Sequence, residues 1–191
     1  MSRINEILDF WFGKKEDPNY GQIRRSWFIK NPIFDKEIGN RFKLDYEKAA
    51  SGKLNHWREE AQGCLALIIL LDQFPRNLFR GNKRTYATDE QALSLTRYAL
   101  EHGYDHELIP VQRWFIYIPL GHSESLSDQI QGVELASSLG DDSDSLFITS
   151  QANKHLDVIR RFGRFPHRNQ ILGRKSTPEE EAFLMKPGSS F

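Results

Sequence analysis

The first apolar residues of the chain recur at helical spacing. Ile4, Ile7 and Trp11 fall on one face, because they lie three and four positions apart. Ser2 precedes them and can cap the first turn, and Gly13 follows them. The pattern predicts a helix between Ser2 and Gly13.

A polar loop over residues 14–22 separates this helix from a second one. Asn31 followed by Pro32 is typical of a helix start, because Asn caps the first turn and proline lacks an N–H that the first turn would leave unpaired. Gly52 marks the end of the second helix. Its apolar face consists of Phe34, Ile38, Phe42, Tyr46 and Ala49.

Residues 56–73 are richer in apolar residues on all sides than the other helical segments, which predicts a central helix. A parallel strand over 65–71 is the alternative, but no repeating strand–helix pattern supports it. Pro75 follows Phe74 and is expected to end this helix.

The third quarter of the chain predicts two more helices. Thr88 and Gln91 have capping-box spacing, and the helix that they begin ends at Gly103. A second, apolar helix begins at Pro110, and we expect Pro119 to stop it.

Three helices complete the pattern. One starts at Ser125 or Ser127, presents an apolar face and ends at Gly140. The next starts in an acidic turn, which the helix dipole favours, and the last starts with a capping box. The apolar face of the first of these helices consists of Leu126, Ile130 and Val133. The second helix runs from the acidic turn Asp141–Asp144 to about Phe162. The capping box of the last helix is Thr177–Glu180.

Together these segments predict an all-α fold, an array of about eight antiparallel helices in one domain over residues 1–191. Residues 74–81 resemble residues 165–174, since both contain Phe-Pro followed closely by Arg-Asn and then Gly. This similarity favours repeated helical hairpins. The chain contains no dinucleotide-binding, phosphate-loop or zinc-protease motif.

Composition narrows the functional classes. The formal net charge is +0, which argues against a dedicated nucleic-acid binder. Cys64 is the single cysteine, so the chain can form neither an internal disulfide nor a cysteine zinc site. The longest apolar run, 64–71, is too short to cross a membrane, and the first residues lack the apolar core of a signal peptide. We therefore expect a cytoplasmic protein without membrane contact, metal or cofactor.

Basic residues gather near the C-terminus. No acid lies between Asp157 and Glu179, whereas this interval contains several arginines and His167. Arginine binds phosphate and carboxylate with two parallel hydrogen bonds, so the cluster predicts an anion site. Alternatively, these arginines pair with acids elsewhere in the fold. The basic residues are Arg160, Arg161, Arg164, Arg168, Arg174 and Lys175.

A second polar cluster follows the most apolar helix. Asp72, Arg76 and Asn77 must find partners there, because buried polar groups are almost always hydrogen-bonded. A structural network that fixes the turn is one interpretation, and the edge of a pocket is the other.

The segment 121–125 invites a hydrolase interpretation. A nucleophile elbow needs a glycine two residues after the serine, but Ser125 follows Ser123 at that spacing. His122 and Glu124 could instead exchange protons with a substrate. The spacing of these residues relative to His155 and His167 matches no standard metal site, and Glu124 could simply stabilise the start of the next helix.

The sequence resembles an uncharacterised, mainly bacterial family, domain of unknown function 924. The resemblance covers essentially the whole chain and implies an all-helical fold similar to tetratricopeptide arrays, without an established activity. Ser125 departs from the family pattern, in which an acid commonly follows His-Ser-Glu. The segments that carry the resemblance are 7–13, 70–77, 119–124 and 162–174.

The resemblance and the local chemistry lead to one set of candidate residues. His122 and Glu124 are the candidate catalytic groups. The candidate ligand-binding residues are Asp72, Arg76, Asn77, Arg164, His167, Arg168, Asn169 and Arg174.

Three functional hypotheses follow. The first is a domain that binds a peptide, a protein or a small anionic ligand, which helical arrays commonly do. The second is an enzyme for a phosphorylated or carboxylated small molecule, with arginines holding the anion and His122 or Glu124 transferring protons. In the third, the polar motifs only support the fold. The sequence does not indicate an oligomeric state.

Overall fold

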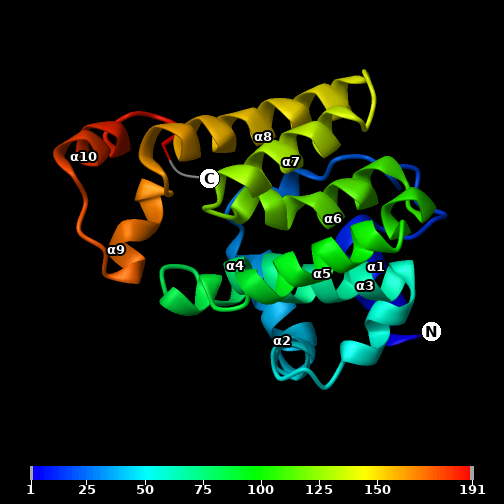
Figure 1. Cartoon of the computed structure of the whole chain (residues 1–191). Helices are drawn as coiled ribbons and strands as arrows, with labels where there is room; N and C mark the ends of the chain where they lie inside the picture. The colour runs from blue at the N-terminus through cyan, green and yellow to red at the C-terminus, as the bar shows by residue number, and fades with distance from the viewer. Residues whose placement is uncertain (1, 190–191) are drawn as a thin grey trace.

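The computed structural model describes residues 2–189, which contain helices and connecting segments but no strand (Figure 1). The predicted all-helical array is confirmed. The α-helices are α1 (Arg3–Phe12), α2 (Pro32–Ala50), α3 (Ala61–Ile68), α4 (Phe74–Leu78), α5 (Asp89–Glu101), α6 (Pro110–His122), α7 (Leu126–Ser137), α8 (Ser143–Phe162), α9 (Asn169–Leu172) and α10 (Pro178–Leu184). Short 3₁₀ segments are η1 (Arg25–Trp27), η2 (Asn55–Glu59), η4 (Lys83–Tyr86), η5 (Tyr104–Glu107) and η6 (Pro166–Arg168), and η3 (Ile69–Gln73) is a π-helical turn.

Four of the predicted helix starts are confirmed by hydrogen bonds in which the capping side chain accepts from a backbone N–H of the first turn. Ser2 accepts from the N–H of Asn5, and Asn31 accepts from the first turn of α2. Asp142 caps α8 in the same way. Thr177 forms a complete capping box with Glu180 at α10. These ends are fixed by contacts within four residues, which explains why the local sequence predicted them.

The prediction that Pro75 ends the central helix was wrong. α3 continues through the π turn η3 into α4, which ends at Leu78. Pro75 lacks the N–H that would bond to the carbonyl of Leu71, but Thr88 Oγ1 donates to that carbonyl at 2.5 Å. The predicted capping box at Thr88 was wrong for the same reason, because its hydroxyl is used by Leu71 and makes no cap.

Pro119 also lies inside a helix instead of ending it, since α6 continues to His122. Side chains from neighbouring helices bond to carbonyls in this part of α6. Thr96 Oγ1 donates to the carbonyl of Ile116 at 2.8 Å, and Gln129 Nε2 donates to that of Gly121 at 2.7 Å. These bonds give partners to carbonyls in the last two turns of α6, where a helix end leaves backbone carbonyls without helical donors.

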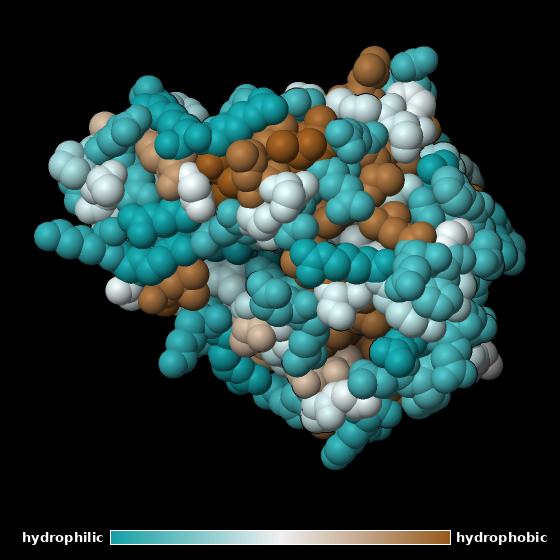
Figure 2. Space-filling model, in the orientation of Figure 1, coloured by the Kyte–Doolittle hydropathy of each residue, from teal (hydrophilic) through white to brown (hydrophobic). Residues whose placement is uncertain are grey.

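α7 buries a different face from the one predicted. Leu126 and Ile130 are 46% and 39% exposed, whereas Asp128 and Gln129 are buried. α7 packs against both α6 and α8, and a Cβ at Gly132 would lie 3.3 Å from Leu120 Cβ. This close approach decides which face turns inward. Figure 2 shows an apolar area on the surface over α7 and α8.

The core surrounds α3, whose residues from Cys64 to Ile68 are at most 1% exposed. α1, α5 and α6 pack against α3, and α7 and α8 continue the array beyond α6. A smaller apolar cluster at the C-terminal end joins Ile159 and Phe165 to Phe183. Successive antiparallel neighbours are consistent with the tetratricopeptide-like description. No helix of residues 2–189 is long and apolar enough to cross a membrane.

Candidate functional site

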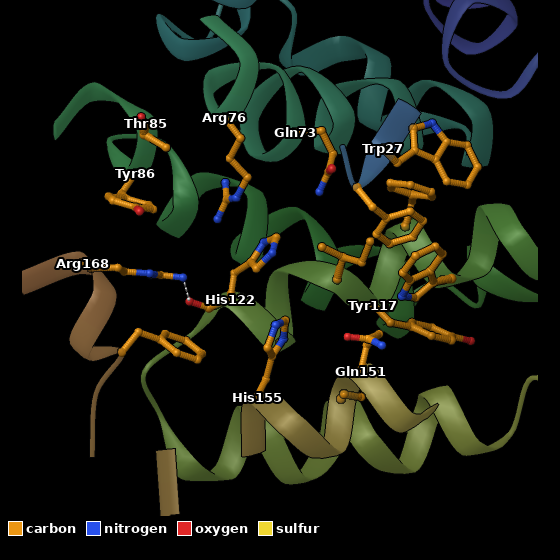
Figure 3. Close-up of a pocket in the computed structure, with 18 of the residues that line it drawn as sticks. Trp27, Gln73, Arg76, Thr85, Tyr86, Tyr117, His122, Gln151, His155 and Arg168 are labelled. Atoms are coloured by element: carbon orange, nitrogen blue, oxygen red, sulfur yellow. Dashed lines mark hydrogen bonds between the residues drawn. The ribbon is translucent and has the colours of Figure 1, made fainter. Parts of the chain in front are cut away.

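A pocket of about 530 Å³ opens between α4, α6 and α8, with η1, η4 and η6 at its edges. Figure 3 shows two chemically different ends. Arg76 and Arg168 mark one end, Trp27 and Tyr117 mark the other, and His122 lies between them. This volume is in the usual range for a small-molecule site.

The π turn η3 places Asp72 behind the pocket. Asp72 is 0% exposed and does not line the pocket itself. Its Oδ1 lies 2.8 Å from His122 Nδ1, and Gln73 Nε2 donates to its Oδ2 at 2.6 Å. Burial by itself would raise the pKa of Asp72, but the charge of Arg76 and the hydrogen bonds from His122 and Gln73 outweigh it. The pKa is therefore lowered and Asp72 is ionised at neutral pH.

His122 is the last residue of α6 and lines the pocket. Burial, followed by the nearby charge of Arg76, lowers its pKa despite the opposing effect of Asp72. The imidazole is therefore neutral at pH 7. An ionised carboxylate only accepts hydrogen bonds, so Nδ1 carries the proton that faces Asp72. Nε2 is left as an acceptor.

Arg76 is held by two aspartates. Its NH1 and NH2 donate to Asp89 Oδ1 and Oδ2 at 2.9 and 3.1 Å, and NH1 also donates to the backbone carbonyl of Asp72. Burial opposes the charged form, but Asp72 and Asp89 outweigh it and raise the pKa of Arg76. Its charge is therefore well compensated.

Arg168 is compensated much less. It is 7% exposed, and its guanidinium lies 4.7 Å from the ring centre of Tyr86. NH2 donates to the backbone carbonyl of His122 at 2.9 Å, but Asp89 Oδ2 is 3.5 Å from NH1 and already bonds to Arg76. Its buried Nε has no hydrogen-bond partner among the described residues. Burial, and then the charge of Arg76, lower the pKa of Arg168.

Two further histidines complete this end of the pocket. His155 comes from α8 and His167 from η6. Burial, followed by neighbouring positive charge, lowers the pKa of His155 to about 3 and that of His167 to about 4. Both are therefore neutral at pH 7, and Arg76 and Arg168 provide the positive charge.

Glu124 does not line the pocket, so the structure does not place it beside His122 as a second candidate catalytic group. Arg174 donates to its two oxygens at 2.6 and 2.9 Å, and the N–H of Phe165 donates to Oε1 at 2.7 Å. Burial would raise the pKa of Glu124, but these bonds lower it. Glu124 ties the end of α6 to the C-terminal segment instead of capping α7.

Three other predicted residues belong to the same C-terminal network. Arg164 Nε and NH2 donate to the two oxygens of Glu180 at 2.6 and 2.7 Å. Asn169 bonds to Glu180 and accepts from Arg174 Nε at 2.9 Å. The predicted anion cluster is therefore divided. Arg164, Asn169 and Arg174 pair internally, whereas Arg168 and His167 line the pocket.

The other predicted cluster supplies the opposite wall. Arg76 and Asn77 line the pocket, and Asn77 also donates to Asp35 Oδ1 at 2.8 Å. The two similar segments, 74–81 and 165–174, therefore converge on the same end of the pocket through Arg76 and Arg168.

The aromatic half of the pocket was missed by the sequence interpretation. Trp27, Phe28 and Trp114 line it, and Phe28 stacks on Trp114 with ring centres 5.9 Å apart. Asp89 was also missed as the partner of Arg76. The sequence does not distinguish the three aromatic residues from residues of the hydrophobic core. It also does not show that Asp89 pairs with Arg76, because the two residues are brought together only by the fold. Within residues 2–189, no group of three or more possible ligands is placed to hold a metal ion.

An all-helical array with one polar and one aromatic end to its pocket defines the class of this protein. Residues 7–188 match the family described as bacterial protein of unknown function (DUF924), and the chain belongs to this family. A solved structure of a protein of unknown function from Agrobacterium tumefaciens is 40% identical, with a TM-score of 0.84 over 95% of this chain and 96% of that one. No curated protein matches the chain.

Proposed function

We propose that the protein binds a small anion, a carboxylate or phosphate that carries an apolar group, in the pocket between α4, α6 and α8. The observation that carries this proposal is the incomplete compensation of Arg168. A buried cation is stable only when it is paired and hydrogen-bonded, and Arg168 has a free Nε and shares its nearest carboxylate with Arg76. An anion in the pocket would supply the counter-charge that Arg168 lacks.

The aromatic half of the pocket determines which group the ligand carries besides the anion. Trp27, Phe28 and Trp114 offer ring faces and edges to an apolar group, which aromatic side chains bind well. The anion and the apolar group must lie on opposite sides of His122, as Figure 3 shows for the two ends. A ligand of this shape is small, which favours the small-anion hypothesis over a peptide or protein partner.

The test is a thermal-shift measurement with 3-phenylpropanoate, compared with propanoate and with 3-phenylpropanol. Only the first combines an anion with a ring, so it should raise the melting temperature most. At about a hundred times the dissociation constant, the gain is about 2.7 kcal/mol, or roughly 5–10 °C for a chain of this length. Equal shifts with all three compounds would contradict the proposal.

Arg168→Gln supplies the residue-level test. We expect it to abolish the shift with 3-phenylpropanoate without lowering the melting temperature of the free protein, because Gln relieves an uncompensated buried charge. Arg160→Gln is the matched control, since Arg160 is exposed and lies 3.9 Å from Asp157. A lower melting temperature of ligand-free Arg168→Gln would instead assign Arg168 to the structural network.

A further inference from the structure

Asp72 and His122 form a hydrogen-bonded dyad in which Asp72 lies in the protein interior and His122 lines the pocket. Asp72 is fully buried, whereas the side chain of His122 is 17% exposed and lines the pocket. The proton on Nδ1 faces Asp72 across 2.8 Å. The opposite ring nitrogen of His122, Nε2, is therefore unprotonated and can accept a proton. Because His122 lines the pocket, this nitrogen can act as a general base.

Both members of the dyad are held in place. Gln73 Nε2 donates to Asp72 Oδ2 at 2.6 Å, which leaves Oδ1 for His122. Arg168 NH2 donates to the backbone carbonyl of His122 at 2.9 Å. The imidazole is therefore oriented by a fixed carboxylate, and the guanidinium proposed to hold the anion is bonded to the same residue. Such prior orientation is the main requirement for efficient proton transfer and charge stabilisation.

The described lining of the pocket contains neither serine nor cysteine. Cys64 is buried in the core, and Ser123 Oγ donates to Asp128 Oδ2 at 2.7 Å. Thr85 lines the pocket, but its Oγ1 donates to the backbone carbonyl of Phe79 at 2.5 Å. We therefore take water as the nucleophile of a reaction that uses His122 as a base.

We propose that the pocket hydrolyses small carboxylic esters with an apolar acyl group, with His122 as general base and Asp72 as its positioning residue. This inference rests on the proposed function, because the acid that hydrolysis releases is itself an anion with an apolar group. Arg168 is the donor to the carbonyl oxygen during the reaction and to the carboxylate afterwards. The acyl group occupies the aromatic half between Trp27 and Trp114.

In the reaction, His122 Nε2 takes one proton from a water molecule as its oxygen bonds to the carbonyl carbon. The carbonyl electron pair moves to oxygen, where Arg168 donates to the resulting oxyanion. The pair then returns and the bond to the alcohol oxygen breaks, while His122 gives the proton to the leaving alcohol. The acid loses its remaining proton to solvent, so no oxidant, reductant or metal is needed.

The experiment measures release of 4-nitrophenolate from 4-nitrophenyl 3-phenylpropanoate by the full chain and by two variants, His122→Asn and Asp72→Asn. Asn at 122 keeps a donor for Asp72 but has no basic nitrogen. We expect His122→Asn to lower kcat at least about 100-fold, the usual contribution of a general base. KM and the thermal shift with 3-phenylpropanoate should change little, because binding depends on Arg168 and the aromatic half.

Asp72→Asn tests the positioning role. We expect it to lower kcat with little effect on KM, since it disturbs the tautomer and orientation of His122 and not the ligand contacts. The rate of the unaltered protein should rise with pH and level off below His122's ordinary pKa of about 6.5, because that pKa is lowered. The charged and titratable groups around His122 are Asp72, Arg76, Asp89, His155, His167 and Arg168.

His106→Asn is the matched control for hydrolysis by surface imidazole. His106 is 75% exposed outside the pocket, and its Nε2 lies 3.8 Å from Asp105 Oδ2. Its variant should retain full activity. Binding of 3-phenylpropanoate without hydrolysis, or hydrolysis unchanged in His122→Asn, would overturn this inference and leave the proposed function standing. Absence of both binding and hydrolysis would overturn both.

Discussion

Charge compensation differs sharply among the side chains at the polar end of the pocket. Asp72 accepts from Gln73, and its Oδ1 lies 2.8 Å from His122 Nδ1 and 3.5 Å from Arg76 NH1. These partners offset the cost of burying its carboxylate. Arg168, in contrast, has one donor, Nε, without a hydrogen-bond partner among the described residues. We therefore assign Asp72 to the support of the fold and of His122, and propose Arg168 as the residue that holds a ligand.

We predict that Asp72→Ala lowers the free energy of unfolding by about 2–4 kcal/mol, because the donors of His122 and Gln73 lose their acceptor and Arg76 keeps only Asp89. Urea denaturation measures this change. Asp157→Ala is the control, since Asp157 is 75% exposed and its ion pair with Arg160 should contribute at most about 1 kcal/mol. A similar small loss in both variants would show that the buried dyad does not stabilise the fold.

The elements around the pocket are positioned by close backbone approaches and by side chains that bond to helix carbonyls. η3 carries Asp72 to the back of the pocket, and Thr88 from the start of α5 supplies the bond that Pro75 cannot make. At the other end of the array, Gly63 lets α3 approach η2. A Cβ at Gly63 would lie 2.1 Å from the carbonyl oxygen of Trp57.

We predict that Gly63→Ala destabilises the protein by about 1–3 kcal/mol, because α3 and η2 must move apart. Gly39→Ala is the matched control in α2, where the new Cβ would meet only Leu78 Cδ2 at 3.7 Å. There the better helix propensity of alanine should stabilise by up to about 1 kcal/mol. Thermal or urea unfolding of both variants measures the difference, and equal effects would contradict the steric argument.

The whole molecule assembles the pocket from segments that are distant in the sequence, from Trp27 in η1 to Arg168 in η6. This assembly half-buries three neutral histidines, His122, His155 and His167, beside two arginines. Each has a lowered pKa, so the unfolded chain binds more protons than the folded one at mildly acidic pH. The consequence is a stability that depends on pH.

We predict that stability is highest above about pH 6.5 and falls as the pH decreases toward about 4, with each histidine contributing roughly 1.4 kcal/mol per pH unit while it stays neutral in the fold. Denaturation at about pH 7.5 and about pH 5 measures the slope. His155→Gln should flatten it, because the pKa of His155 is lowered to about 3, whereas exposed His106→Gln should not. An unchanged slope in His155→Gln would contradict the assignment of a half-buried neutral histidine.

The sequence by itself determined the helices and several of their ends. Caps such as Asn31 and Asp142 act within one helical turn, so their effect is visible in neighbouring residues. It also identified both polar clusters whose residues Arg76 and Arg168 meet at the pocket.

Only the tertiary structure decided what those residues do. Pro75 lies inside a continuous helical segment, and Thr88 bonds to the carbonyl that this proline leaves without a helical donor. Pro119 also lies inside a helix, and Thr96 and Gln129 bond to other carbonyls of that helix. Glu124 binds Arg174 fifty residues away, whereas Arg168 has one donor, Nε, without a hydrogen-bond partner among the described residues. Pairing between distant residues depends on how the helices pack, and packing is not encoded in the spacing of any single segment. In the C-terminal cluster, that pairing separates Arg164 and Arg174, which bond to acids of the fold, from Arg168, which lines the pocket.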